Sequence, residues 1–67
     1  MKLADFLDYD KVKIKIDNNK EYVGTPIVVN YSDETASGED EIVISTNDSG
    51  GNLIEFKESE IMLIEAV

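Results

Sequence analysis

Apolar and polar residues alternate most clearly near the start of the chain. From Lys11 to Ile16, valine or isoleucine occupies every second position and lysine occupies the positions between them. A period of two places the two kinds of side chain on opposite faces of a β-strand. The apolar set, Val12, Ile14 and Ile16, predicts the buried face of a first strand. The lysine set, Lys11, Lys13 and Lys15, predicts its solvent face.

Four further segments have the β-branched and aromatic composition of strands. We expect these strands at about 21–31, 41–46, 53–56 and 61–64. The segments between them contain turn-forming residues, with a hairpin turn at Asn47–Gly51 and a tight turn at Lys57–Glu60. Ser32–Asp40 is small, polar and acidic, so we expect a mobile loop there. Five short strands with no helix between them predict antiparallel pairing.

The first residues show a different spacing. Leu3, Phe6 and Leu7 are spaced as on one face of a helix, and Asp5 lies near the start, where a carboxylate suits the helix dipole. We expect one or two turns of helix over Leu3–Asp8. Because such a segment is too short to be stable alone, its apolar face should dock on the rest of the fold.

Two residues interrupt the second strand. Pro26 has no backbone N–H to donate, so it belongs at a sheet edge or a bulge, and Gly24 permits a sharp bend. A long strand with such a kink allows a small sheet to curl over on itself. The alternative is an ordinary edge strand in which proline prevents pairing with another chain. We predict an all-β (mainly β) fold, a five-stranded antiparallel barrel with a short N-terminal helix, as one domain spanning residues 1–67.

Charge narrows the choice of partner. Fifteen acidic residues stand against six lysines and no arginine, for a formal net charge of −9. Proteins bind nucleic acid largely through cations that neutralise phosphates, so we expect nucleic-acid binding to be disfavoured unless the lysines gather on one face. Lys11, Lys13 and Lys15 are the candidates for such a face, and the alternative is that they only solvate the first strand. Acidity of this size implies solubility or a basic protein partner.

The residue types exclude several kinds of chemistry. The chain contains no cysteine and no histidine, which removes thiolate and imidazole zinc ligands and histidine general bases. The acidic segments at 8–10 and 33–41 do not fit the spacing of an EF-hand loop, and no serine has a histidine to activate it. We expect no enzyme activity, cofactor or metal site. Without an apolar run of about 20 residues or a signal peptide, we expect a cytoplasmic protein with no membrane partner.

Two stretches resemble the motifs of Sm-like proteins, a family of small SH3-like barrels. Residues 12–24 run from an alternating strand through a polar turn into a strand with a glycine, as in the first Sm motif. Residues 53–64 run from a strand through a tight turn into an apolar strand, as in the second. The whole chain is similar to small Sm-like proteins of unknown function from Gram-positive bacteria and their prophages. This resemblance implies an SH3-like/Sm-like barrel.

The residues with which Sm proteins bind RNA have no counterpart in this sequence. Those proteins have an aspartate and an asparagine in the loop after the second strand and an Arg-Gly pair before the last strand. The corresponding turn here is Lys57–Glu60, and the loop at 32–40 is also acidic. Carboxylates therefore occupy the places where phosphates and bases would lie.

The expected function is a non-catalytic protein-interaction module, and the alternative is residual RNA binding through the three lysines of the first strand. The resemblance also implies self-assembly, because Sm-like barrels form rings by pairing exposed edge strands. In that arrangement Val43, Met62 and Ala66 would face a neighbouring copy. The candidate interaction surface consists of Tyr22, Tyr31, Val43 and Met62.

Overall fold

The computed structural model describes residues 2–17, 20–46 and 51–67. Its strands are β1 (Val12–Ile16), β2 (Glu21–Asn30), β3 (Glu41–Thr46), β4 (Leu53–Lys57) and β5 (Ile61–Ala66). Short 3-10 turns accompany them, among them η1 (Leu3–Phe6), η3 (Ser32–Glu34) and η4 (Glu58–Glu60). All five predicted strands are confirmed, and β5 continues further than expected. Most of the hairpin turn expected at Asn47–Gly51 lies outside the described ranges.

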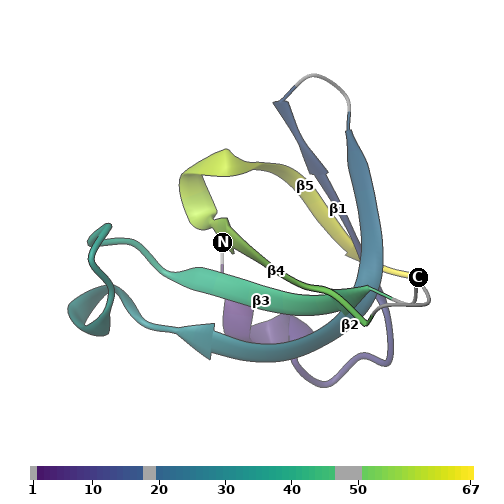
Figure 1. Ribbon diagram of the computed structural model, residues 1–67, viewed down its shortest axis with the longest axis horizontal. Coiled ribbons are helices and arrows are strands. Elements are labelled where there is room, and N and C mark those ends of the chain that lie inside the picture. Colours follow the sequence, from purple (N-terminus) through teal and green to yellow (C-terminus); the bar gives the residue numbers. More distant parts are fainter. Residues whose placement is uncertain (1, 18–19, 47–50) are drawn as a thin grey trace.

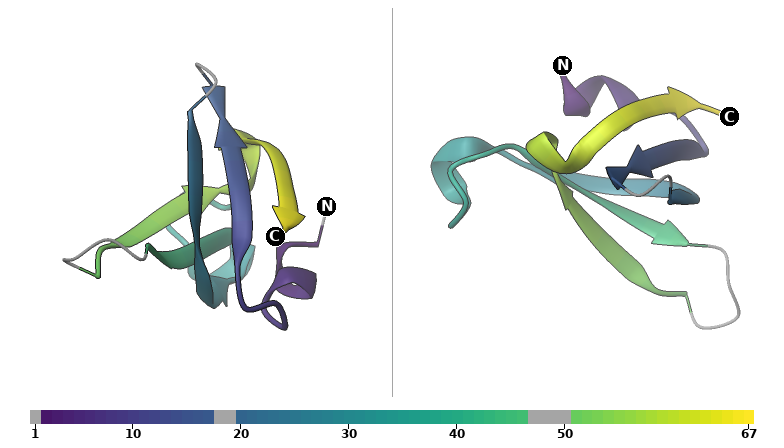
Figure 2. Two further views of the ribbon diagram at one scale, coloured as in Figure 1. Left: turned by 90° about the vertical axis from the view of Figure 1, so that its right-hand side faces the viewer. Right: turned by 90° about the horizontal axis from the view of Figure 1, so that it is seen from above.

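The strands form one antiparallel sheet in the order β4-β3-β2-β1-β5. The start of β2 pairs with β1 as far as Val12 opposite Gly24, and the remainder of β2 pairs with β3. β2 therefore belongs to both halves of the sheet, and it bends so that the two halves lie at an angle to each other (Figures 1 and 2). Among the described residues, no pairing joins β4 to β5. The mainly β class is confirmed, and closure into a barrel stays a prediction.

The core lies on the concave side of this sheet. Cross-strand pairs place Ile14 opposite Ile64, and side chains of directly opposed residues share one face. The expected inward positions of β1 are confirmed, because Val12 and Ile14 are fully buried. Ile16, at the end of β1, is only half-buried. The buried apolar cluster contains Leu3, Val12, Ile14, Val29, Ile42, Ile44, Phe56, Ile61 and Ile64.

The interruption of β2 marks its kink, as the sequence predicts. Gly24 is buried where β1, β2 and β3 meet, and a Cβ on it would lie 2.5 Å from the backbone oxygen of Ser45. The glycine therefore allows two backbones to approach closely. Two residues later, the register of β2 against β3 shifts between Pro26 and Val28, which makes Ile27 the extra residue of a β-bulge. Proline thus lies next to a bulge, where its missing N–H is tolerated.

The N-terminal helix is shorter than expected. The structure forms a single 3-10 turn, η1, with the Leu7 N–H donating to the Ala4 carbonyl at 3.2 Å. Four residues suffice to orient one leucine inward, because Leu3 is only 1% exposed while Phe6 and Leu7 pack partly against the core. The expected docking is confirmed, since η1 contacts β2 and β3.

Replacement of Gly24 tests the close approach of β2 to β3. The Ser45 oxygen belongs to the backbone, so it cannot move aside without distorting β3. Gly24→Ala should therefore lower the free energy of unfolding by about 1–3 kcal/mol, and Gly24→Val by more. Urea denaturation followed by circular dichroism measures this loss. Val23→Thr, at an exposed position of the same strand, should change stability by less than about 0.5 kcal/mol. Equal effects of Gly24→Ala and Val23→Thr would contradict the close approach.

Replacement of Leu3 tests whether η1 completes the core. Leu3→Ala should cost about 2–5 kcal/mol of unfolding free energy, because it opens a cavity at a fully buried site. Leu53→Ala is the matched control, since Leu53 is 65% exposed and its truncation should cost less than about 0.5 kcal/mol. Thermal denaturation of the two variants separates these outcomes. A Leu3→Ala protein as stable as the control would mean that η1 is not part of the folded core.

Candidate protein-interaction surface

The four predicted interaction residues do not form one surface. Tyr22 is half-buried, and its ring centroid lies 5.3 Å from that of Phe56 at an interplanar angle of 54°. This tilted packing makes Tyr22 part of the core wall. Tyr31 follows the other end of β2, exposed beside a hollow that is also lined by Leu3 and Asp40. The length of β2 therefore separates the two tyrosines.

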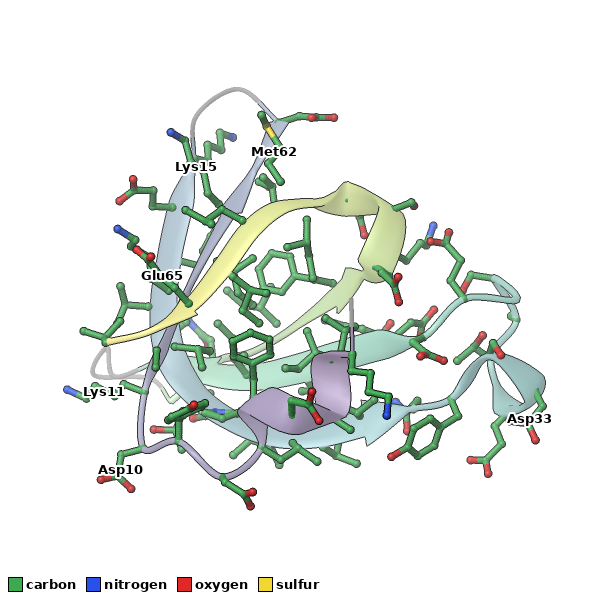
Figure 3. The ribbon with its side chains drawn as sticks, turned by 180° about the vertical axis from the view of Figure 1, so that it is seen from behind. Asp10, Lys11, Lys15, Asp33, Met62 and Glu65 are labelled. Carbon is green, nitrogen blue, oxygen red and sulfur yellow. The ribbon has the colours of Figure 1, made fainter. Side chains whose placement is uncertain are left out.

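Val43 and Met62 lie on different strands. Val43 is half-buried on the outer face of β3, opposite Val28 of β2 and Glu55 of β4. Met62 is 62% exposed on β5, at a register shift against β1. Figure 3 shows Met62 near Lys15, toward the end of β1. Ala66 is exposed at the other end of β5, opposite Val12.

Lys13 and Lys15 share the outer face of β1, as predicted, and Lys11 directly precedes the strand, but carboxylates accompany these lysines. Lys13 Nζ lies 2.9 Å from Glu65 Oε1, on the neighbouring strand β5. The hydrogen bond and charge of Glu65 raise the pKa of Lys13, and the charge of Glu21 adds to this effect. Figure 3 shows Glu65 between Lys11 and Lys15. The lysine row is therefore partly neutralised, which weakens the electrostatic basis for nucleic-acid binding.

The acidic loop between β2 and β3 has an internal hydrogen-bond network. The Thr35 hydroxyl donates to the Glu39 carbonyl at 2.8 Å and accepts the Gly38 N–H at 3.1 Å. The Ser37 hydroxyl donates to Glu41 Oε2 at 2.7 Å. Glu41 is almost fully buried at the start of β3, so this bond gives its carboxylate a hydrogen-bond partner. Composition predicts a polar, mobile loop and does not predict these bonds, because they depend on how the loop folds back on itself.

A second set of bonds ties this loop to η4. Glu39 accepts the Ser59 N–H at 2.9 Å and the Ser59 hydroxyl at 3.0 Å, across twenty positions of sequence. The two bonds hold the pKa of Glu39 below its ordinary value, chiefly through the hydroxyl, and the charge of Lys57 lowers it further. A shallow open depression lies between the two segments, lined by Ser32, Gly38, Glu39, Asp40, Glu58 and Ser59.

The bulge in β2 creates an apolar surface that the sequence pattern does not predict. Ile27 is 52% exposed and Val28 is 42% exposed, and both lie opposite Val43 on the outer face of the sheet. Leu53 of β4 follows diagonally, since it pairs with Ser45 two residues along from Val43. We call Ile27, Val28, Val43 and Leu53 the outer apolar patch. Pro26 signals a bulge in the sequence, but the face to which the next residues turn depends on the position of the register shift.

Both ends of the sheet have exposed apolar side chains. Leu53 lies on β4, and Met62 and Leu63 lie on β5. These strands each have one strand partner among the described residues, so their other edges leave backbone N–H and C=O groups without a ladder. In Figure 2, β4 and β5 diverge from η4, so the two edges face different directions.

The contact between Glu39 and Ser59 predicts a pH dependence. Because the folded-state pKa of Glu39 is lowered, the contact stabilises the fold above the ordinary carboxylate pKa, and this stabilisation is lost as pH falls through the folded-state pKa. Ser59→Ala removes the hydroxyl donor, so the pKa of Glu39 should rise part of the way to its ordinary value. NMR titration of the Glu39 side chain measures it. Ser32→Ala, in the same depression, should leave that pKa unchanged, and an equal response to both variants would contradict the contact.

Within residues 2–17, 20–46 and 51–67, no three acidic side chains come together in a way that could hold a metal ion. No helix in these ranges has the length and apolar character needed to cross a membrane. The features that stand out are the outer apolar patch and the two sheet edges. Comparisons with protein-family models, with curated proteins and with solved structures found no match to this chain.

Proposed function

We propose that this chain is a small Sm-like domain that acts as a non-catalytic protein-interaction module through the edges of its sheet, and that it also self-associates there. The observation that supports this most directly is the presence of exposed apolar side chains on both edge strands, Leu53 on β4 and Met62 on β5. Edges of this kind are templates for pairing with another strand.

The arrangement of the strands suits self-association between unlike edges. β4 and β5 lie at opposite ends of one sheet, so β4 of one copy can add to β5 of the next. Such head-to-tail contacts produce a ring if the rotation between copies closes and a filament if it does not. The five-strand order and the motifs at 12–24 and 53–64 support the Sm-like assignment on which this arrangement is based.

Charge opposes this association at low ionic strength. Each copy has a net charge of −9, so two copies repel until salt screens the field. Self-association should therefore increase with salt. Interfaces driven by opposite charges behave in the reverse way.

Sedimentation at increasing protein and salt concentration tests the proposal. The wild-type chain should show a mass above that of the monomer at high salt, and Leu53→Lys or Met62→Lys should each restore the monomer, because each places a charge on one edge. Ile27→Lys is the control, since it puts the same charge on the outer face of β2 and should leave the edges able to pair. A monomeric wild-type protein under all conditions would refute self-association. Equal effects of all three variants would refute the role of the edges.

A further inference from the structure

The two edges of the sheet differ in regularity. β4 pairs with β3 through five successive residue pairs, from Glu41 opposite Lys57 to Ser45 opposite Leu53, with no register shift. β5 has a register shift opposite Lys15 and Ile16, where Met62 is the extra residue. Bulges twist an edge and interrupt its ladder, and they are a common protection against strand addition. β4 is therefore the better template for an added strand.

The two edges also differ in their free charge. On β5, Glu65 already forms an ion pair with Lys13. On β4, the Glu55 carboxylate receives neither a hydrogen bond nor an ion pair from the part of the chain that the structure describes. Glu55 is exposed on the outer face of β4, where its neighbours along the strand are Leu53 and Lys57, and it lies opposite Val43 of β3. An added strand would thus meet, beside Leu53, a carboxylate with which no described residue forms an ion pair.

The inner face of β4 determines which side chains an added strand would need on that face. Ile54, which alternates with Leu53 and Glu55, is only half-buried and packs against the core. A strand added beside β4 would place every second side chain next to Ile54 and Phe56. Those positions favour valine or isoleucine, and the outward position opposite Glu55 favours lysine or arginine. The Leu53 end of β4 lies away from β5 in Figure 2, which leaves this end open to a strand.

We propose that the β4 edge binds an extended segment of a basic partner protein, in which apolar residues alternate with lysine or arginine. The net charge of −9 attracts such a segment and repels a second copy of this chain at low and moderate ionic strength. The proposal is based on the edge-binding function above and names the partner class for one edge. Main-chain hydrogen bonds supply the docking, and the cation opposite Glu55 supplies the selectivity.

The probe is a fluorescently labelled seven-residue peptide of alternating valine and lysine, titrated into the full chain by fluorescence anisotropy. At about 0.15 M salt, charges more than about 8 Å apart are largely screened, so a distant carboxylate contributes little. Glu55→Lys should weaken binding at least about fivefold, because it replaces an attraction by a repulsion. Glu34→Lys makes the same charge change in the β2–β3 loop and should weaken binding less than about twofold.

Two further peptides separate strand addition from attraction by net charge. Proline at the central valine keeps the charge but removes an N–H and blocks the ladder, and glutamate in place of lysine keeps the apolar face but reverses the charge. Both should bind at least about tenfold more weakly, which corresponds to about 1.4 kcal/mol. Hydrogen exchange measured by NMR should show new protection at β4 amides and none at β5 when the valine-lysine peptide is bound.

Several results would overturn the proposal. Equal losses with Glu55→Lys and Glu34→Lys, or full binding of the proline peptide, would show attraction by net charge alone. If the β4 amides were already protected from hydrogen exchange without peptide at this salt concentration, a second copy of the chain would be the occupant of the β4 edge. The outcomes are independent of those for self-association, because a chain that stays monomeric at high salt can still bind the peptide, and one that assembles can fail to bind it.

Discussion

The close approach of two backbones at Gly24 is the constraint on which the rest of the structure depends. A side chain there would meet the Ser45 carbonyl at 2.5 Å, so β2 and β3 can come together only over a glycine. At the same residue β2 stops pairing with β1 and continues beside β3 alone. One strand thus serves both halves of the sheet, and the apolar faces of β1 and β3 enclose a shared core.

The bulge beside Pro26 exposes apolar side chains on the outer face of the sheet. It inserts Ile27 and turns Ile27 and Val28 toward solvent, opposite Val43. The bulge next to the Gly24 junction therefore contributes two residues to the outer apolar patch. The patch reaches the β4 edge at Leu53, which pairs with Ser45.

The acidic side chains differ in whether they already form contacts inside the chain. Glu65 forms an ion pair with Lys13. Glu39 accepts a hydrogen bond from Ser59, and Glu41 accepts one from Ser37. Glu55 has no such contact among the described residues, although it lies on the most regular edge. Other carboxylates, such as those of Asp5 and Glu34, also lack such a contact. It is therefore the position of Glu55 on the β4 edge, together with the total acidity, that supports the proposed basic partner.

The sequence by itself determined the five strands and the position of the kink, because period-two alternation, turn residues, and a glycine and proline within one strand are local properties. Only the tertiary structure decided that Tyr22 packs against Phe56, that Glu65 pairs with Lys13, and that Glu39 reaches Ser59. It also reduced the predicted helix to one 3-10 turn and placed the four candidate residues on separate surfaces. These features depend on register, on the site of a bulge and on contacts between distant segments. A one-residue change in register moves a side chain to the opposite face, and no local pattern encodes that choice.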